Sequence, residues 1–211
     1  MKHKTNPRKP GARAARLSAL FPQWLIVPVR NLVEGGYDTE LGLIKQRLPE
    51  GNGLVLDVGV GTGETVPLFA QGNLIGLEID AYPITIASAR GNGRFVRGDA
   101  VALPFRDNVF SAVMLCKTGH HLDADQLAAT AAESYRVLAP GGRLIFLDPV
   151  PASSKTTLFH RLIAAVELGS HHREFAESAA FFHAFHLDGV EHFRKRGFDF
   201  YIAVFLKSNN G

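Results

Sequence analysis

The 211-residue sequence predicts an α/β protein with a Rossmann-like fold, in which helices cover both faces of an open, mostly parallel sheet. Short apolar runs alternate with helical segments, which is typical of parallel strands joined by crossover helices. The first run ends at Asp57 and leads into glycines at positions 59, 61 and 63. The second run ends at Glu78, 21 positions after Asp57, near the spacing of about 20 residues at which a strand-end acid meets a ribose. These observations indicate a site for an adenosine-containing cofactor.

Five apolar runs mark the strands of the parallel part of the sheet. They are rich in valine, leucine and isoleucine, as expected for strands that are buried on both faces. We expect these strands at residues 54–58, 74–78, 95–96, 109–116 and 143–147.

Helices are expected between these strands and ahead of the first one. The segment 37–48 places Leu41, Ile44 and Leu48 on one helical face. Asp123 is a candidate N-cap for the longest helix. The remaining helices of this part are expected at residues 12–20, 64–70, 83–90 and 123–138.

The register of the glycines distinguishes between cofactors. A dinucleotide fingerprint requires a third glycine at position 64, where this chain has Glu64. A carboxylate there would repel a pyrophosphate seated on the helix N-terminus. S-adenosylmethionine carries no phosphate, and its sulfonium and ammonium suit acids at Asp57 and Glu64. The pattern therefore favours S-adenosylmethionine over NAD, and disfavours a nicotinamide oxidoreductase.

Over about residues 50–149 the chain resembles the class I S-adenosylmethionine-dependent methyltransferases, in particular the small-molecule branch that is similar to methyltransferase type 11. Five motifs occur in the order of that family: Val55–Gly63, Gly76–Asp80, Gly98–Phe105, His120–Leu122 and Arg136–Pro149. The resemblance implies the class I methyltransferase fold, with S-adenosylmethionine as the cofactor. It says little about the acceptor.

The resemblance also implies which residues bind the cofactor. Asp57 is expected near the methionine ammonium, Glu78 on both ribose hydroxyls and Asp99 on the adenine amino group. Ile79 is expected to pack on the adenine ring. The other cofactor-binding candidates are Gly59, Gly61, Thr62, Gly63, Ala100, Cys116 and Lys117.

Methyl transfer from a sulfonium is an in-line displacement with a good leaving group, so the protein mainly has to orient the reactants and exclude water. A general base is required only when the nucleophile arrives protonated. His120 and His121 are the candidate bases, because histidine titrates near neutrality. One of them could instead cap the next helix or pack under the cofactor. Lys117 could meet the cofactor carboxylate or an anionic acceptor, and we expect Cys116 to be a small core residue rather than a nucleophile.

After Pro149 the resemblance becomes weaker. Helices are expected at residues 156–168 and 173–185, and a capping box at Asp188 predicts a further helix that ends near residue 196. Residues 200–206 are one convincing strand, whereas the family usually ends in a hairpin. Either one C-terminal edge strand is missing or a weak strand lies among residues 175–187. Histidines recur in this region without a metal-ligand motif, so we expect them in the acceptor pocket or on the surface and expect no metal.

Composition and charge set further limits. The chain has one cysteine, Cys116, and no apolar stretch of the about 20 residues that cross a bilayer, so a cytoplasmic location is expected. Six lysines and arginines and no acid stand among the first 16 residues, whereas the whole chain has a net charge of +3. We interpret this basic leader as a solvated arm. The alternative is an anchor for an anionic partner such as a lipid headgroup at a membrane surface, an acyl-carrier protein or RNA. The sequence indicates no oligomeric state.

We therefore expect a basic leader and N-terminal helical lid at residues 1–48. An S-adenosylmethionine-binding methyltransferase domain is expected at residues 49–211, in which residues 150–197 form a helical cover on the acceptor side. The expected function is methyl transfer to a small-molecule or lipid-like acceptor. The alternatives are an RNA or protein methyltransferase that uses the basic arm and a non-catalytic S-adenosylmethionine-binding module. A nucleic-acid acceptor is disfavoured, because no Asn/Asp-Pro-Pro-Tyr/Phe motif follows the fourth strand.

Overall fold

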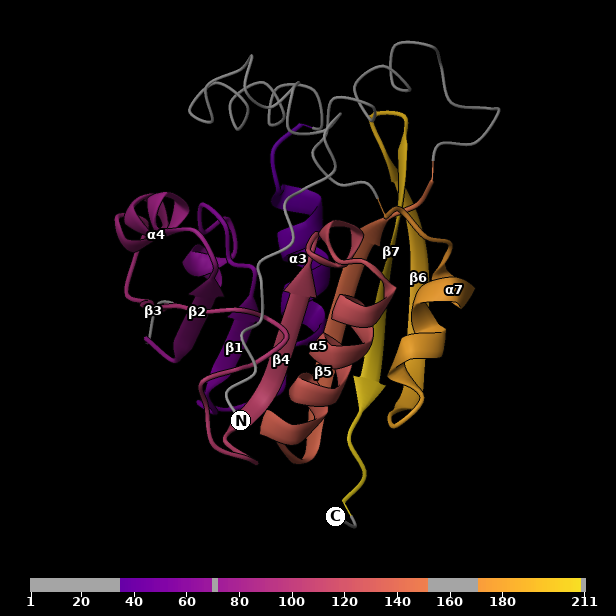
Figure 1. Ribbon diagram of the computed structural model, residues 1–211. Helices are drawn as coiled ribbons and strands as arrows, with labels where there is room; N and C mark the ends of the chain where they lie inside the picture. Colours follow the sequence, from indigo (N-terminus) through magenta and orange to yellow (C-terminus); the bar gives the residue numbers. More distant parts are fainter. Residues whose placement is uncertain (1–34, 70–71, 152–170, 210–211) are drawn as a thin grey trace.

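The computed structural model describes residues 35–69, 72–151 and 171–209, and the expected helices at 12–20 and 156–168 lie outside these ranges (Figure 1). The described residues form one seven-stranded sheet in the order β3-β2-β1-β4-β5-β7-β6. Strands β1 to β5 are parallel, and β7 is antiparallel to both of its neighbours. The strand bounds are β1 Val55–Val58, β2 Leu74–Glu78, β3 Arg94–Arg97, β4 Phe110–Cys116, β5 Leu138–Pro149, β6 His186–Lys195 and β7 Phe198–Leu206. The predicted fold class is confirmed.

The C-terminal edge strand is present, and it lies where the sequence predicted a helix. Strand β6 pairs with β7 along its length, from His186 opposite Leu206 to Lys195 opposite Phe198. The apparent capping box at Asp188 is a β-bulge, because the register shifts between Leu187 and Gly189. The prediction of a helix from Asp188 was wrong, since cross-strand pairing with β7 outweighed the local capping signal.

Helices and short 3₁₀ turns connect the strands. The longest, α5, begins with a capping box in which Asp123 accepts from the Gln126 amide, as predicted for its N-cap. The helix predicted at 64–70 is only a 3₁₀ turn, because Pro67 supplies no N–H to a longer helix. The bounds are α3 Asp38–Arg47, η1 Val66–Leu68, α4 Ala81–Ser88, η2 Gly119–His121, α5 Ala124–Val137, α7 Phe175–Ala179 and η3 Ala180–Phe182.

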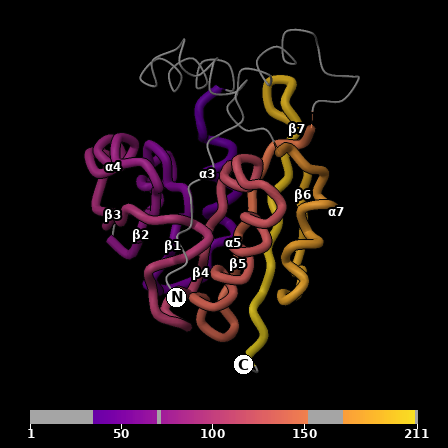
Figure 2. Tube along the Cα trace, viewed as in Figure 1, coloured from indigo at the N-terminus to yellow at the C-terminus, as the bar shows by residue number. Residues whose placement is uncertain are grey.

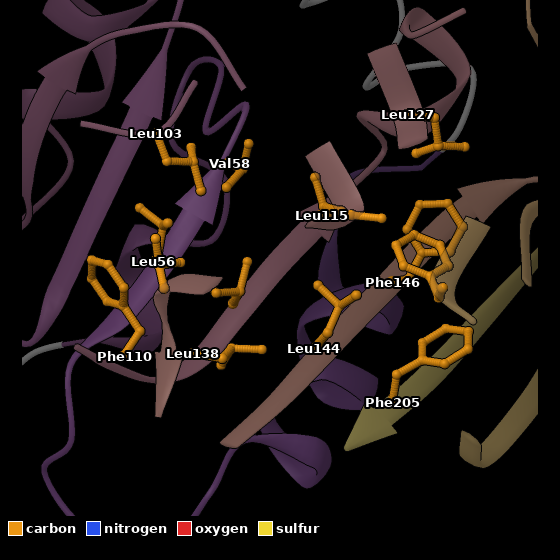
Figure 3. Packing of buried hydrophobic residues seen from close by; sticks show 14 of the residues in the cluster. Leu56, Val58, Leu103, Phe110, Leu115, Leu127, Leu138, Leu144, Phe146 and Phe205 are labelled. Atoms are coloured by element: carbon orange, nitrogen blue, oxygen red, sulfur yellow. The ribbon is translucent and has the colours of Figure 1, made fainter. Parts of the chain in front are cut away.

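Two apolar layers pack on the two faces of the sheet, with α5 over one face and α3 over the other (Figure 1). Alternate residues of the central strands divide between these layers, as the period of a strand requires. Figure 3 shows the layer under α5, where Leu127 of the helix lies near Leu115 and Phe146. Ile44 of α3 is fully buried in the other layer, as its place on the predicted apolar face requires.

The topology places chemically active residues at one edge of the sheet. Because β1, β2, β4 and β5 are parallel, their carboxyl ends lie at the same edge, where open α/β sheets bind ligands. The β6–β7 turn also reaches this edge, because β6 runs antiparallel to β7 and β7 runs antiparallel to β5. Figure 2 follows the chain from α3 in indigo to this terminal hairpin in yellow.

Candidate active site

The glycine turn after β1 packs tightly against two neighbouring segments. Gly59 has a φ of +77°, and a Cβ added to it would lie 2.5 Å from Thr118 Oγ1. That threonine is held in place by donating a 3.0 Å hydrogen bond to the Val58 carbonyl. Gly63 has a φ of +82°, and a Cβ there would lie 2.8 Å from the Cα of Ala87 in α4. Glycine is therefore required at both positions by backbone conformation and by close approach.

Glu78 is fixed at the end of β2 by backbone amides. Its carboxylate accepts hydrogen bonds from the N–H groups of Gly61 at 3.1 Å, Ile79 at 2.8 Å and Asp80 at 3.2 Å. The carboxylate thus joins the glycine turn to the second strand end. The Ile79 side chain beside it is 57% exposed, so an apolar surface stands next to the acid that we expect to meet the ribose.

Asp99 follows β3 and is exposed at the same edge. Its Oδ1 accepts a 3.2 Å hydrogen bond from the Val101 amide, which closes a short turn around Ala100. Arg136 holds the loop that follows. It donates to the carbonyl oxygens of Leu103 and Phe105 and forms ion pairs with Glu133 and Asp107, a supporting role that sequence analysis did not identify.

Asp57 is buried at the tip of β1, with 2% of its surface exposed. Thr65 donates a hydrogen bond to Oδ2, while Oδ1 has no hydrogen-bond partner among the described residues. The pKa of Asp57 is raised to about 7, mainly by burial; the Thr65 hydrogen bond opposes this shift, and the nearby carboxylates of Glu64 and Glu78 contribute to it. A buried carboxyl group with an unmatched acceptor oxygen fits a cationic group such as an ammonium.

The Glu64 carboxylate contacts two nearby side chains, those of Thr62 and Arg90. Thr62 Oγ1 donates to Glu64 Oε1 at 2.5 Å, and Arg90 lies 3.7 Å from the same oxygen. Thr62 itself is buried within the glycine turn. Glu64 therefore stabilises the turn, and Asp57 is the better candidate for attracting a cation.

Lys117 faces α3. Its Nζ lies 3.2 Å from Glu40 Oε1 and 4.5 Å from the centre of the Tyr37 ring. Lys195, from the end of β6, contacts the same carboxylate with its Nζ 2.6 Å from Oε2. Glu40 is fully buried between the two lysines. The ammonium group of Lys117 is thus directed to Glu40. A contact of Lys117 with the cofactor stays a prediction. Neighbouring Cys116 is a buried core residue whose pKa is raised by burial.

The two histidines after β4 differ in their surroundings. His120 is 5% exposed, and its Nδ1 lies 2.8 Å from Oδ1 of Asp148, which is 4% exposed at the end of β5. His121 is exposed and contacts His120 through its ring, with 4.1 Å between centroids. His172 stacks on His120 at 5.1 Å with nearly parallel rings. The Nδ1 atom of His120 thus forms an ion pair with Asp148 when the ring is protonated.

Sequence analysis missed the role of Asp148, although a signal was present. The residue directly follows the predicted fifth strand. In the structure Cys116 pairs with Leu147, so Asp148 lies beside the start of the segment Lys117–His121, which we call the histidine turn. Burial raises the pKa of Asp148 to about 8, against the opposing positive charges of His121, His172 and Arg173.

A second segment rests on the histidine turn. Arg173 donates to the carbonyl oxygens of Leu122 at 2.9 Å and Gly119 at 3.3 Å, and the His171 amide donates to the His120 carbonyl at 3.0 Å. The sequence predicted Arg173 only as the start of a helix. The helix begins at Phe175 instead and gives way to η3, so residues 171–173 have no regular secondary structure; we call them the strap.

The predicted acceptor-side cover at residues 150–197 is therefore helical only in part. Residues 175–182 are helical, and residues 186–195 are strand β6. Within the described ranges, no group of three or more His, Cys, Asp or Glu side chains is arranged to hold a metal ion. Nor does any helix in these ranges have the length and apolarity needed to span a bilayer.

Comparisons with known proteins agree with this geometry. Residues 56–146 match the family described as a methyltransferase domain. A demethylmenaquinone methyltransferase of Thermus thermophilus is 38% identical over 119 residues, covering 51% of this chain and 53% of that protein. A ubiquinone/menaquinone biosynthesis C-methyltransferase of Desulfotalea psychrophila is 36% identical over 109 residues, covering 48% of this chain and 43% of that protein. The chain thus spans about half the length of these curated relatives.

Similarity in three dimensions extends further along the chain. A solved SAM-dependent methyltransferase from Thermotoga maritima superposes with a TM-score of 0.71 and 23% identity, covering 92% of this chain and 99% of that chain. This likeness includes the C-terminal part of the sheet, beyond the family match. The predicted fold is confirmed, and the match over residues 56–146 agrees with the predicted resemblance to methyltransferases.

Proposed function

We propose that this chain, whose residues 56–146 form a methyltransferase domain in a class I methyltransferase fold, transfers the methyl group of S-adenosylmethionine to a small-molecule or lipid-like acceptor. The observation that carries the proposal is the buried Asp57 carboxyl group, whose Oδ1 has no partner among the described residues. It stands at the turn where the cofactor ammonium would lie. A group of carboxyl side chains of this kind suits a cation and opposes a pyrophosphate.

The residues at the sheet edge have separate roles in this proposal. S-adenosylmethionine, when bound, supplies a methyl group activated by a sulfonium. Glu78, which three backbone amides already hold in position, would accept hydrogen bonds from the ribose hydroxyls. The exposed Ile79 side chain would pack on the adenine ring. Asp99 would accept from the adenine amino group. Gly59, Gly61, Thr62 and Gly63 would surround the methionine portion, and Ala100, Cys116 and Lys117 complete the proposed set.

A small or lipid-like acceptor is supported by the relatives described above, whose names refer to demethylmenaquinone and to ubiquinone and menaquinone biosynthesis. We also propose a cytoplasmic location, from the single buried cysteine, and the division into a leader with lid at 1–48 and a methyltransferase domain at 49–211. The described residues carry no observation that favours an RNA or protein acceptor or a non-catalytic module.

The test is calorimetric titration of the purified chain with S-adenosylmethionine, S-adenosylhomocysteine and NAD. We expect the first two to bind and NAD not to bind. Glu78→Ala should weaken binding about 10- to 100-fold, since a hydrogen bond to a charged group contributes roughly 1.5–3 kcal/mol. Glu50→Ala, at an exposed acid between α3 and the start of β1, is the matched control. Binding of NAD alone would refute the proposal, and binding of S-adenosylmethionine without transfer to any acceptor would favour the non-catalytic module.

A further inference from the structure

We propose that strand β6 is an interaction surface for a second copy of this chain, whose own β6 pairs with it in the antiparallel direction and joins the two sheets. Three features of β6 support this assignment: an unpaired outer edge, exposed apolar side chains and an order of charges that an antiparallel copy complements. Strands β6 and β3 lie at opposite margins of the sheet, so the test of this surface does not depend on the proposed methyl transfer.

The outer edge of β6 has no strand beside it in the part of the chain that the structure describes. It is the last strand in the sheet order, at the margin of the sheet in Figure 1, and it pairs there with β7 alone. Outside the β6–β7 ladder, no backbone hydrogen bond between described residues involves positions 186–195. The first seven residues of the strand are exposed. The N–H and C=O groups of alternate residues therefore point to solvent, and such a row is a template for a further strand.

The two edges of the sheet differ in how they are protected against such pairing. Strand β3 has four residues and begins and ends with the exposed arginines Arg94 and Arg97, and both shortness and charge discourage a further strand. Strand β6 has ten residues and contains no proline. Its bulge shifts the register only between Leu187 and Gly189, so residues 189–195 form a regular stretch. Of the two edges, β6 is therefore the one that can accept a partner.

The side chains of β6 leave apolar surface in contact with water. Leu187 is 41% exposed and Val190 is 40% exposed. A lysine on an edge strand usually repels a second strand, but Lys195 directs its charge into the protein, with Nζ 2.6 Å from Oε2 of the buried Glu40. A paired copy would remove part of the apolar surface from water, and this burial favours association.

The charges of β6 are ordered so that an antiparallel copy complements them. Asp188 is exposed near the start of the strand, and Arg194 is exposed near its end. The 3.7 Å contact of Arg194 with Asp199 is a surface ion pair, which contributes little. An antiparallel partner places the end of its strand beside the start of this one. With Val190 on the two-fold axis, Asp188 lies opposite His192 of the second copy and diagonal to Arg194 of that copy, within reach of these long side chains.

The same register suits the other side chains of the strand. Val190 pairs with Ala203, which belongs to the apolar layer under α5, so the two copies of Val190 meet on that face of the sheet. Glu191 lies opposite Gly189 of the second copy, where no side chain disturbs its 2.5 Å contact with Arg47. With Glu191 on the axis instead, two carboxylates would lie opposite each other, which is unfavourable. A two-fold arrangement closes with two chains, so the assembly is a dimer.

The first experiment is analytical ultracentrifugation of the full-length chain over a wide range of concentrations. We expect a monomer that converts to a dimer as the concentration rises, because one pair of strands is a small interface that dissociates on dilution. Val190→Lys places two ammonium groups on the axis and should raise the dissociation constant of the dimer at least about tenfold. Asp188→Lys reverses a charge that meets the second copy and should raise it about three- to tenfold.

Two substitutions outside β6 are the matched controls. Val109→Lys changes a valine just before β4 that is 38% exposed, close to the 40% of Val190. Glu50→Lys reverses the charge of an exposed acid between α3 and β1. Neither should change the dissociation constant, and circular dichroism shows whether each variant is folded. A native chain that stays monomeric, an assembly larger than a dimer, or equal effects of Val109→Lys and Val190→Lys would overturn the proposal.

The second experiment tests the register without a charged substitution. Residues directly opposite each other in an antiparallel pair have Cα atoms about 4.5–5.5 Å apart, within the range of a disulfide. Val190→Cys should therefore form a cross-linked dimer under mild oxidation, whereas Val109→Cys and the native chain, whose Cys116 is buried, should not. In the native chain, amide hydrogens of residues 189–195 should exchange more slowly at high concentration, and those of residues 94–97 should not change. A Val190→Cys chain that stays unlinked, or exchange in β6 that is the same at all concentrations, would refute pairing through this strand.

Discussion

The acids at the two halves of the sheet edge have different partners. On the β1–β3 half, Asp57, Glu78 and Asp99 accept hydrogen bonds from a hydroxyl or from backbone amides, and among the described residues none of them pairs with a lysine, arginine or histidine. On the β4–β7 side, Glu40 contacts two lysines and Asp148 contacts a histidine. The first half therefore keeps negative charge for a ligand, whereas the second is neutralised within the protein.

This difference matches the two reactants of the proposed function. A cationic cofactor binds more tightly to carboxylates that have no basic partner, because its own positive charge can then pair with them. His120, one of the two candidate bases, already has its Nδ1 held by Asp148. Substitutions on the β1–β3 half should consequently change mainly the affinity for the cofactor. Substitutions on the β4–β7 side should change mainly the free energy of unfolding.

The largest effect is expected from Glu40→Ala. It leaves Lys117 and Lys195 buried without their shared carboxylate, and removing one partner of a buried ion pair costs roughly 3–5 kcal/mol. Urea unfolding monitored by circular dichroism measures the loss. Glu50→Ala, an exposed acid just after α3, should change the free energy of unfolding by about 0.5 kcal/mol or less. Equal effects of the two substitutions would mean that the lysines are solvated in the variant.

An intermediate effect is expected from the protonation of Asp57. Its pKa of about 7 lies above the value of 3.8 for a free side chain, so the folded state holds a proton that the unfolded state releases. The contribution of this group to stability therefore falls as the pH rises from about 4 to 7 and is constant above that range. A bound ammonium lowers the pKa again, so affinity for S-adenosylhomocysteine should rise with pH below 7, by about tenfold per unit at most.

Proton release makes this prediction measurable. Calorimetric titrations at pH 6 in two buffers with different ionisation enthalpies should show release of up to about one proton on binding. Asp57→Asn should abolish that release, and Asp99→Asn should keep it. The same release in Asp57→Asn as in the native chain would assign the proton to another group.

The smallest effect on stability is expected from Asp99→Ala. Asp99 is exposed and accepts one hydrogen bond from Val101, so the free energy of unfolding should change by about 0.5 kcal/mol or less. Cofactor affinity should fall by up to about tenfold, since one hydrogen bond is lost. A larger loss of stability than in Glu40→Ala would reverse the comparison between the two halves.

The parallel part of the fold was predictable because each strand carries its own apolar signal. The strand at 74–78 was predicted with its observed bounds, and Asp123 was predicted as a cap and is one. The cofactor-side acids were found because each lies at or just after the carboxyl end of such a strand. Their binding roles stay predictions, while their place at the sheet edge follows from the parallel topology.

What the sequence did not reveal depends on contacts between distant residues. Strand β6 carries a local helix-start signal at Asp188, and only its pairing with β7 makes it a strand. The His120–Asp148 contact joins residues 28 positions apart, and the Glu40–Lys195 contact joins residues 155 positions apart. Local periodicity contains no information about such pairs. The ion pair of Lys117 was missed for the same reason, because its partner lies in a helix that precedes the whole sheet.

The contact between Glu40 and Lys195 also has a consequence for the order of folding. Helix α3 is synthesised before every strand of the sheet, whereas the β6–β7 hairpin that carries Lys195 is synthesised after the five parallel strands. A contact between residues so far apart in the sequence carries a loop-closure entropy cost, and its favourable energy offsets that cost only when both segments are folded. The parallel strands can therefore assemble first, and α3 and the hairpin become ordered together as the final step. The side of the sheet edge formed by α3 and the β6–β7 hairpin is thus completed after the parallel strands, which exposes it to misassembly during synthesis for longer than the rest of the sheet.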